Sequence, residues 1–84
     1  MPRALFVNIK DVNKLQYEIM VFVGDWARRE KTPVPRKEII SAMEERGTKF
    51  FTTINALNSL MRKGYIRRSC EISNKTRFVQ LKGV

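Results

Sequence analysis

The residues in this chain whose types and spacing could support binding chemistry lie between positions 48 and 68. At the roughly 100° turn per residue of an α-helix, this stretch has one polar side and one apolar side. The polar side carries Thr48, Thr52, Asn55, Ser59 and Arg62. The apolar side carries Phe50, Thr53, Ile54, Leu57, Leu60 and Met61. A solvated helix face usually mixes acidic and basic side chains, but this polar side has a cation and no acid. The pattern indicates a surface that reads a polyanion.

Positive charge is concentrated in the second half of the chain. The 84 residues carry a net charge of +9. Residues 1–45 contribute +1 and residues 46–84 contribute +8, with Glu71 as the single acid of the second half. One-sided basicity of this kind is typical of nucleic-acid-binding proteins. A basic surface that serves only solubility is the alternative, although solubility does not require the charges to segregate.

The composition argues against an enzyme. There is no histidine, which removes the commonest general base and a principal zinc ligand, and the carboxylates of Asp25, Glu44 and Glu71 show no paired arrangement. We therefore expect no catalytic activity, no metal and no cofactor. No apolar run approaches the roughly 18 residues of a membrane span. The expected location is the cytoplasm, in association with the nucleoid.

The first half of the chain predicts an arm and two helices. Residues 1–11 contain a short β-prone run with Leu5, Val7 and Ile9 on one face. Residues 12–30 predict a helix that Asp11 or Asn13 caps. Its buried stripe consists of Leu15, Ile19, Phe22, Val23 and Trp26. Gly24 lies inside this helix, where close approach of a neighbouring helix would explain it.

Two further helices follow, joined by a short turn. The prolines in residues 32–35 predict an extended linker. Residues 36–46 predict the second helix, with Ile39, Ile40 and Met43 as its buried side. Gly47 is expected to end this helix in the left-handed conformation, and Thr48 to cap a third helix over 48–63. Two helices joined by a glycine-containing turn of about three residues form a helix-turn-helix.

The C-terminal part predicts a β-hairpin over residues 65–81. Gly64 ends the third helix, and alternating side chains follow it up to a turn at residues 73–76. A two-residue loop at Asn74 and Lys75 would pair Cys70 with Val79 and Arg68 with Leu81. Ile72, Cys70, Val79 and Leu81 would then share the core-facing side. The chain as a whole is predicted to be one α+β domain, residues 1–84.

Three helices followed by a hairpin resemble the winged helix-turn-helix plan. Pro35, Glu38 and Ile39 resemble the start of the second helix in many bacterial repressors. The run from Thr52 to Ile66 resembles the third helix and first wing strand of MarR-like and LexA-like DNA-binding domains. The resemblance covers roughly residues 12–81. It implies a three-helix fold with residues 65–81 as the wing. The sequence is not expected to supply the additional terminal helices of MarR-like proteins or the second domain of LexA-like ones.

The resemblance also implies roles for individual residues, because the third helix of this plan enters the major groove. The base-reading candidates are Asn55, Arg62, Thr52 and Ser59, with Asn55 placed to bond adenine. The candidates for contact with the DNA backbone are Thr48, Lys49, Arg36, Lys37, Arg67, Lys75 and Arg77. Phe51 borders the reading face, where contact with a thymine methyl group and partial core burial are both open.

The expected partner is double-stranded DNA, and the expected function is sequence-specific binding by a small transcriptional regulator, such as a repressor encoded by a phage, plasmid or mobile element. A homodimer is expected, because one module of this size contacts few base pairs. The alternative function is a winged-helix interaction module that docks on RNA polymerase or another acidic protein. RNA is a less favoured ligand, because the major groove of A-form RNA is too narrow for a helix.

Overall fold

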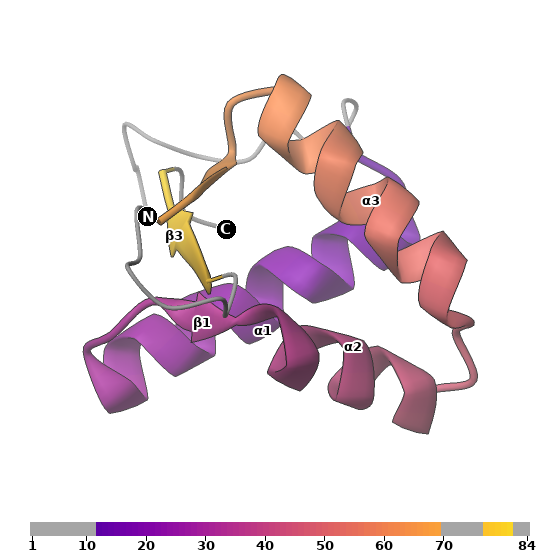
Figure 1. Cartoon of the computed structure of the whole chain (residues 1–84), viewed down its shortest axis with the longest axis horizontal. Helices are drawn as coiled ribbons and strands as arrows, with labels where there is room; N and C mark the ends of the chain where they lie inside the picture. The colour runs from indigo at the N-terminus through magenta and orange to yellow at the C-terminus, as the bar shows by residue number, and fades with distance from the viewer. Residues whose placement is uncertain (1–11, 70–76, 82–84) are drawn as a thin grey trace, which may run out of the picture.

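The computed structural model describes residues 12–69 and 77–81. Within them it shows a small α+β fold of three helices and a three-stranded antiparallel sheet (Figure 1). The elements in chain order are α1 (Lys14–Glu30), β1 (Val34–Pro35), α2 (Arg36–Glu45), α3 (Phe50–Arg62), β2 (Ile66–Arg68) and β3 (Arg77–Gln80). This layout is compatible with that of a winged helix. The strand expected in residues 1–11 and the turn expected at Asn74 and Lys75 lie outside the described residues.

A reciprocal cap sets the start of α1. The Gln16 backbone N–H donates to the Asn13 side chain at 2.8 Å, and the Asn13 backbone N–H donates to Gln16 Oε1 at 3.3 Å. This capping box satisfies two N–H groups that the helix leaves without a partner. Of the two caps that the sequence allowed, Asn13 is the one observed. The helix therefore begins at Lys14, two residues later than predicted.

Gly47 ends α2 through a Schellman motif. Its φ of +89° lies in the left-handed region, where residues with a Cβ atom are strained. The Gly47 N–H bonds the Glu44 carbonyl at 2.9 Å, and the Thr48 N–H bonds the Met43 carbonyl at 3.0 Å. This confirms the predicted role of Gly47.

The predicted cap of the third helix is wrong. The α3 helix begins at Phe50, and Lys49 occupies its N-cap position without a side-chain hydrogen bond to the helix. Thr48 lies one residue too early to cap α3, because its backbone N–H closes α2. At the other end, Gly64 has φ +81°. Gly64 and Tyr65 repeat the Schellman pattern with bonds of 3.1 Å and 3.0 Å to Met61 and Leu60.

The predicted linker contains the strand β1. Val34 pairs with Phe78 and Pro35 with Arg77, antiparallel, so that β3 lies between β1 and β2. A two-residue strand carries no periodic signal, and proline is depleted in strands. Pro35 is tolerated because β1 is an edge strand, where a missing N–H breaks no ladder between central strands.

The predicted register of the hairpin is wrong by three residues. Arg68 pairs with Phe78 and Arg67 with Val79, instead of Arg68 with Leu81. An odd shift moves side chains to the other face of a strand. Phe78 is therefore the buried residue of β3, while Leu81, predicted to face the core, is 42% exposed. Burial of the large Phe78 ring beside Ile66 decides the register, whereas the prediction rested on an assumed two-residue turn.

The core lies between the three helices and the inner face of the sheet. Its buried residues are Ile19, Met20, Val23, Val34, Ile39, Met43, Ala56, Leu57, Leu60, Tyr65, Ile66 and Phe78. Phe22 and Trp26, which were predicted in the buried stripe of α1, are partly buried and pack against this cluster. Ile40 was predicted on the buried side of α2 and is half-buried.

The neighbour of Gly24 is a strand residue, which corrects the predicted contact with a helix. A Cβ atom at Gly24 would lie 3.4 Å from the side-chain nitrogen of Gln80 in β3, the nearest atom. This is an ordinary van der Waals distance, and the Gln80 side chain can adjust. Gly24 is therefore not required by its surroundings.

Replacing Gly24 with alanine is expected to stabilise the protein. Alanine lowers the entropy cost of forming α1, so the free energy of unfolding should rise by about 0.5–1 kcal/mol. The midpoint of thermal unfolding should rise by about 2–8 °C. The matched variant Gly47→Ala places alanine at φ +89° and should lose about 1–2 kcal/mol. A lower midpoint for Gly24→Ala would show that the contact with Gln80 is tighter than its distance indicates.

Candidate nucleic-acid interface

A line of four exposed side chains runs along the outer side of α3. Phe51, Asn55, Asn58 and Arg62 are all exposed. They are spaced by four, three and four residues, which places them above one another on a helix. The opposite side carries Thr53, Ala56, Leu57 and Leu60, which are buried against the core. We call the four exposed residues the outer line of α3.

The outer line overlaps the predicted reading face and is rotated from it. Asn55 and Arg62 belong to both. Thr52 is exposed on one flank, and Ser59 on the same flank is half-buried. Thr48 is half-buried in the turn that precedes α3. Asn58 was missed by the prediction, although its spacing of three residues from Asn55 and four from Arg62 could have indicated it.

Phe51 and Phe50 form an exposed aromatic pair at the start of α3. Their ring centroids are 5.3 Å apart in an edge-to-face arrangement. Phe51 is 75% exposed, so it is not buried in the core, and contact with a ligand is the role that stays open. Phe50 is 43% exposed, although the helical pattern placed it on the apolar side.

The predicted backbone-contacting cations lie on several elements. Arg36 and Lys37 are exposed in the first turn of α2, and Lys49 is exposed just before α3. Arg67 is exposed on β2, on the sheet face opposite to its neighbour Arg68, because successive side chains of a strand alternate. Lys75 lies outside the described residues. Exposed cations therefore lie at the start of α2, just before α3, and on the strand that follows α3.

Arg77 is the predicted cation whose side chain is already engaged. It is half-buried, and its guanidinium donates a hydrogen bond to the Pro33 carbonyl at 3.5 Å. This bond ties β3 to the segment that enters β1. Arg77 thus has a structural contact that the sequence did not indicate.

Acidic side chains are absent from α3 and from the described strands. In the described residues, all carboxylates lie on α1 and α2. The ion pairs within this part of the chain join Arg28 with Asp25, Arg29 with Glu30, and Arg46 with Glu18. None of them involves the cations at the start of α2, before α3 or on β2. These cations therefore form no ion pair with the described residues.

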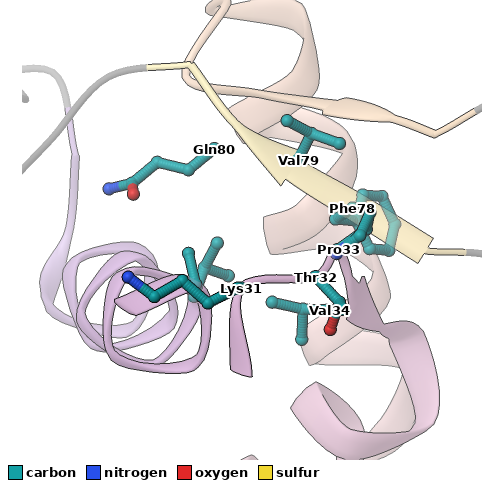
Figure 2. Close-up of a pocket in the computed structure, with 9 residues that line it drawn as sticks. Lys31, Thr32, Pro33, Val34, Phe78, Val79 and Gln80 are labelled. Carbon is teal, nitrogen blue, oxygen red and sulfur yellow. The ribbon is translucent and has the colours of Figure 1, made fainter. Parts of the chain in front are cut away.

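A separate apolar pocket of about 380 Å³ lies away from the outer line, between the end of α1, β1 and β3. Its lining residues are Val23, Ala27, Lys31, Thr32, Pro33, Val34, Phe78, Val79 and Gln80 (Figure 2). Among the described residues, none of the predicted DNA-contacting candidates lines it. The pocket thus belongs to a different region of the surface from the proposed reading face.

Over the described residues, no three His, Cys, Asp or Glu side chains stand together as a metal site. No helix in this part of the chain has the length and apolar character needed to cross a membrane. Comparisons of the chain with protein-family models, with curated proteins and with solved structures found no match.

Proposed function

We propose that this protein binds double-stranded DNA in a sequence-specific manner, with α3 in the major groove, and acts as a small transcriptional regulator of the repressor type. The observation that carries the proposal is the outer line of α3, where two amides and a guanidinium are exposed in a row with no acid beside them. The amide and guanidinium groups of this helix face can pair with the hydrogen-bond donors and acceptors that base edges present in the major groove.

Base reading rests on Asn55 and Arg62. An asparagine amide can bond N6 and N7 of adenine together, and an arginine can bond O6 and N7 of guanine. Both side chains lie on the outer line of α3, seven residues and about two helical turns apart. Thr52 and Ser59 lie on the flank of this line, where hydroxyls bond either bases or phosphates. The B-form major groove is wide enough for such a helix, whereas that of A-form RNA is not.

Backbone contacts complete the proposed mode of binding. Arg36, Lys37 and Lys49 are exposed around α3, and cations there would bond phosphates and set the orientation of the helix. The pair β2–β3 and its connection are proposed as the wing, which would carry Arg67 and Lys75 to the backbone or the minor groove. Arg77 would support the wing through its bond to Pro33.

A homodimer is part of the proposal. The outer line runs over eleven residue steps, from Phe51 to Arg62, which is roughly 16 Å of helix and covers only a few base pairs. So short a site recurs too often to be unique, and a two-fold dimer doubles it.

Selection of bound duplexes from a random DNA pool tests the proposed function. We expect enrichment of one motif, repeated as a palindrome with half-sites about one helical turn apart. Enrichment of a single copy of the motif, without the palindromic repeat, would indicate that the protein binds DNA as a monomer. Failure to enrich any motif, together with no binding of the starting pool at low salt, would contradict DNA binding altogether.

The exposed pair Phe50 and Phe51 favours a second candidate, docking on an acidic protein such as RNA polymerase. Aromatic side chains are enriched in protein interfaces, and a basic surround would suit an acidic partner. If this candidate is correct, Phe51→Ala should abolish capture of the partner and leave DNA affinity unchanged. If the DNA candidate is correct, Phe51→Ala should weaken DNA binding. Excess DNA should then also displace the acidic partner, because both use the same surface.

A further inference from the structure

A small hollow lies where the start of α2, the middle of α3 and the strands β2 and β3 meet. Its volume is about 90 Å³. Its lining residues are Arg36, Ile54, Leu57, Asn58, Met61, Arg68 and Phe78. Among the described residues, the polar lining consists of two arginines and one asparagine from three different elements, and none of these lining residues is acidic. The tertiary structure thus brings two arginines and an asparagine to one hollow.

The two arginines remain available to a ligand. Within residues 12–69 and 77–81, neither Arg36 nor Arg68 forms an ion pair or a side-chain hydrogen bond. Arg68 shares a face of the sheet with Ile66 and Phe78, because it pairs directly with Phe78. That pairing turns its side chain towards α3, while the adjacent Arg67 points to the other face.

The chemistry of the hollow selects an oxyanion. A guanidinium presents a planar fork of N–H donors that matches phosphate oxygens, and an asparagine amide adds a further donor. The volume of 90 Å³ is far below the roughly 300–1,000 Å³ of pockets for organic ligands. A single phosphate group suits this size, and a base or sugar does not.

We propose that Arg36, Asn58 and Arg68 bind one phosphate group of the DNA backbone and so fix the position of α3 in the groove. The inference rests on the proposed function. Asn58 belongs to the outer line of α3 and also lines the hollow, so the hollow lies at the edge of the reading face. Asn58 then contacts the backbone, while Asn55, one turn earlier, contacts a base. Neither Asn58 nor Arg68 was among the DNA-contacting residues predicted from the sequence.

Replacement of single phosphates by neutral methylphosphonates in the selected duplex tests the proposal. For the unaltered protein, several phosphate positions should be sensitive, and the one held in the hollow should lower the affinity about tenfold or more when it is replaced. In Arg68→Gln, that same position should lose its effect, while other sensitive positions keep theirs. Arg36→Gln should behave in the same way. The control Lys31→Gln removes one positive charge at the end of α1, beside the separate apolar pocket, and should leave the sensitive position unchanged.

Several outcomes would overturn this site and leave DNA binding itself intact. One such outcome is a duplex that binds tightly and whose affinity no single methylphosphonate lowers. Another is Arg68→Gln with unchanged sensitivity at every position, while circular dichroism shows that the variant is folded. If inorganic phosphate binds in the hollow without DNA and no backbone position is sensitive, the hollow takes a free anion and the proposal fails. Absence of any DNA binding would overturn this site and the proposed function together.

Discussion

Raising the salt concentration from 50 to 200 mM is expected to weaken DNA binding about a thousandfold. Binding of cations to phosphates releases the counterions that surround DNA, and this release is less favourable at higher salt. About six cations near α3 and the proposed wing could contact phosphates, which predicts a slope of roughly −5 for log K against log salt concentration. The predicted slope is supported by the absence of carboxylates from α3 and from the described strands, where they would compete with phosphates for these cations.

Fluorescence anisotropy of a labelled duplex, titrated at several salt concentrations, measures the slope. Lys49→Gln should make it shallower by about one unit, because Lys49 lies beside the start of α3. Lys31→Gln is the matched control, because Lys31 lies at the end of α1 and lines the separate apolar pocket. We expect its slope to equal that of the unaltered protein. A slope near zero for the unaltered protein would contradict DNA binding.

The second large effect is expected for Asn55→Ala, which should weaken binding to the preferred duplex by about 1–3 kcal/mol, or roughly 5- to 150-fold. Asn55 is exposed at the centre of the outer line, and its removal leaves an adenine edge without its two partners. Binding to unrelated duplexes should change little, because those complexes rest on phosphate contacts. The ratio between preferred and unrelated DNA should therefore fall almost as far as the affinity does.

Asn58→Ala provides the matched comparison, since it removes the same side chain three residues later. Under the proposed phosphate site, it should weaken preferred and unrelated duplexes by similar factors and leave their ratio unchanged. Circular dichroism and thermal unfolding should show that both variants are folded, because both side chains are exposed. If Asn55→Ala also weakens all duplexes equally, Asn55 contacts the backbone and another residue reads the bases.

The helices and their ends were predictable because their signals are local. The apolar spacing in α1 and α3 follows the helical period, and the bonds that end α2 and α3 join residues at most five positions apart. Gly47 and Gly64 were therefore identified as helix ends from sequence, and both have positive φ. Within α3, Asn55 and Arg62 were correctly placed on the exposed side. The error over Thr48 arose because its backbone N–H closes α2, so that Lys49 takes the N-cap position of α3.

The sheet could not be derived in the same way, because its pairs join residues far apart in the chain. Val34 finds its partner in Phe78, and no local pattern in the linker reports that contact. The register of β2 against β3 depends on which large side chain the core admits, and burial of Phe78 decided it. The same pairing turns Arg68 towards α3, where it lines the same hollow as Arg36 and Asn58.

The sequence by itself therefore determined the three helices, the two glycine-ended turns and the segregation of charge towards the second half. These properties depend on residues within one or two helical turns, or on composition alone. Only the tertiary structure decided which side chains of α3 form the outer line and which groups converge beside it. Convergence depends on how α2, α3 and the sheet pack around one core, and packing is a property of the whole chain.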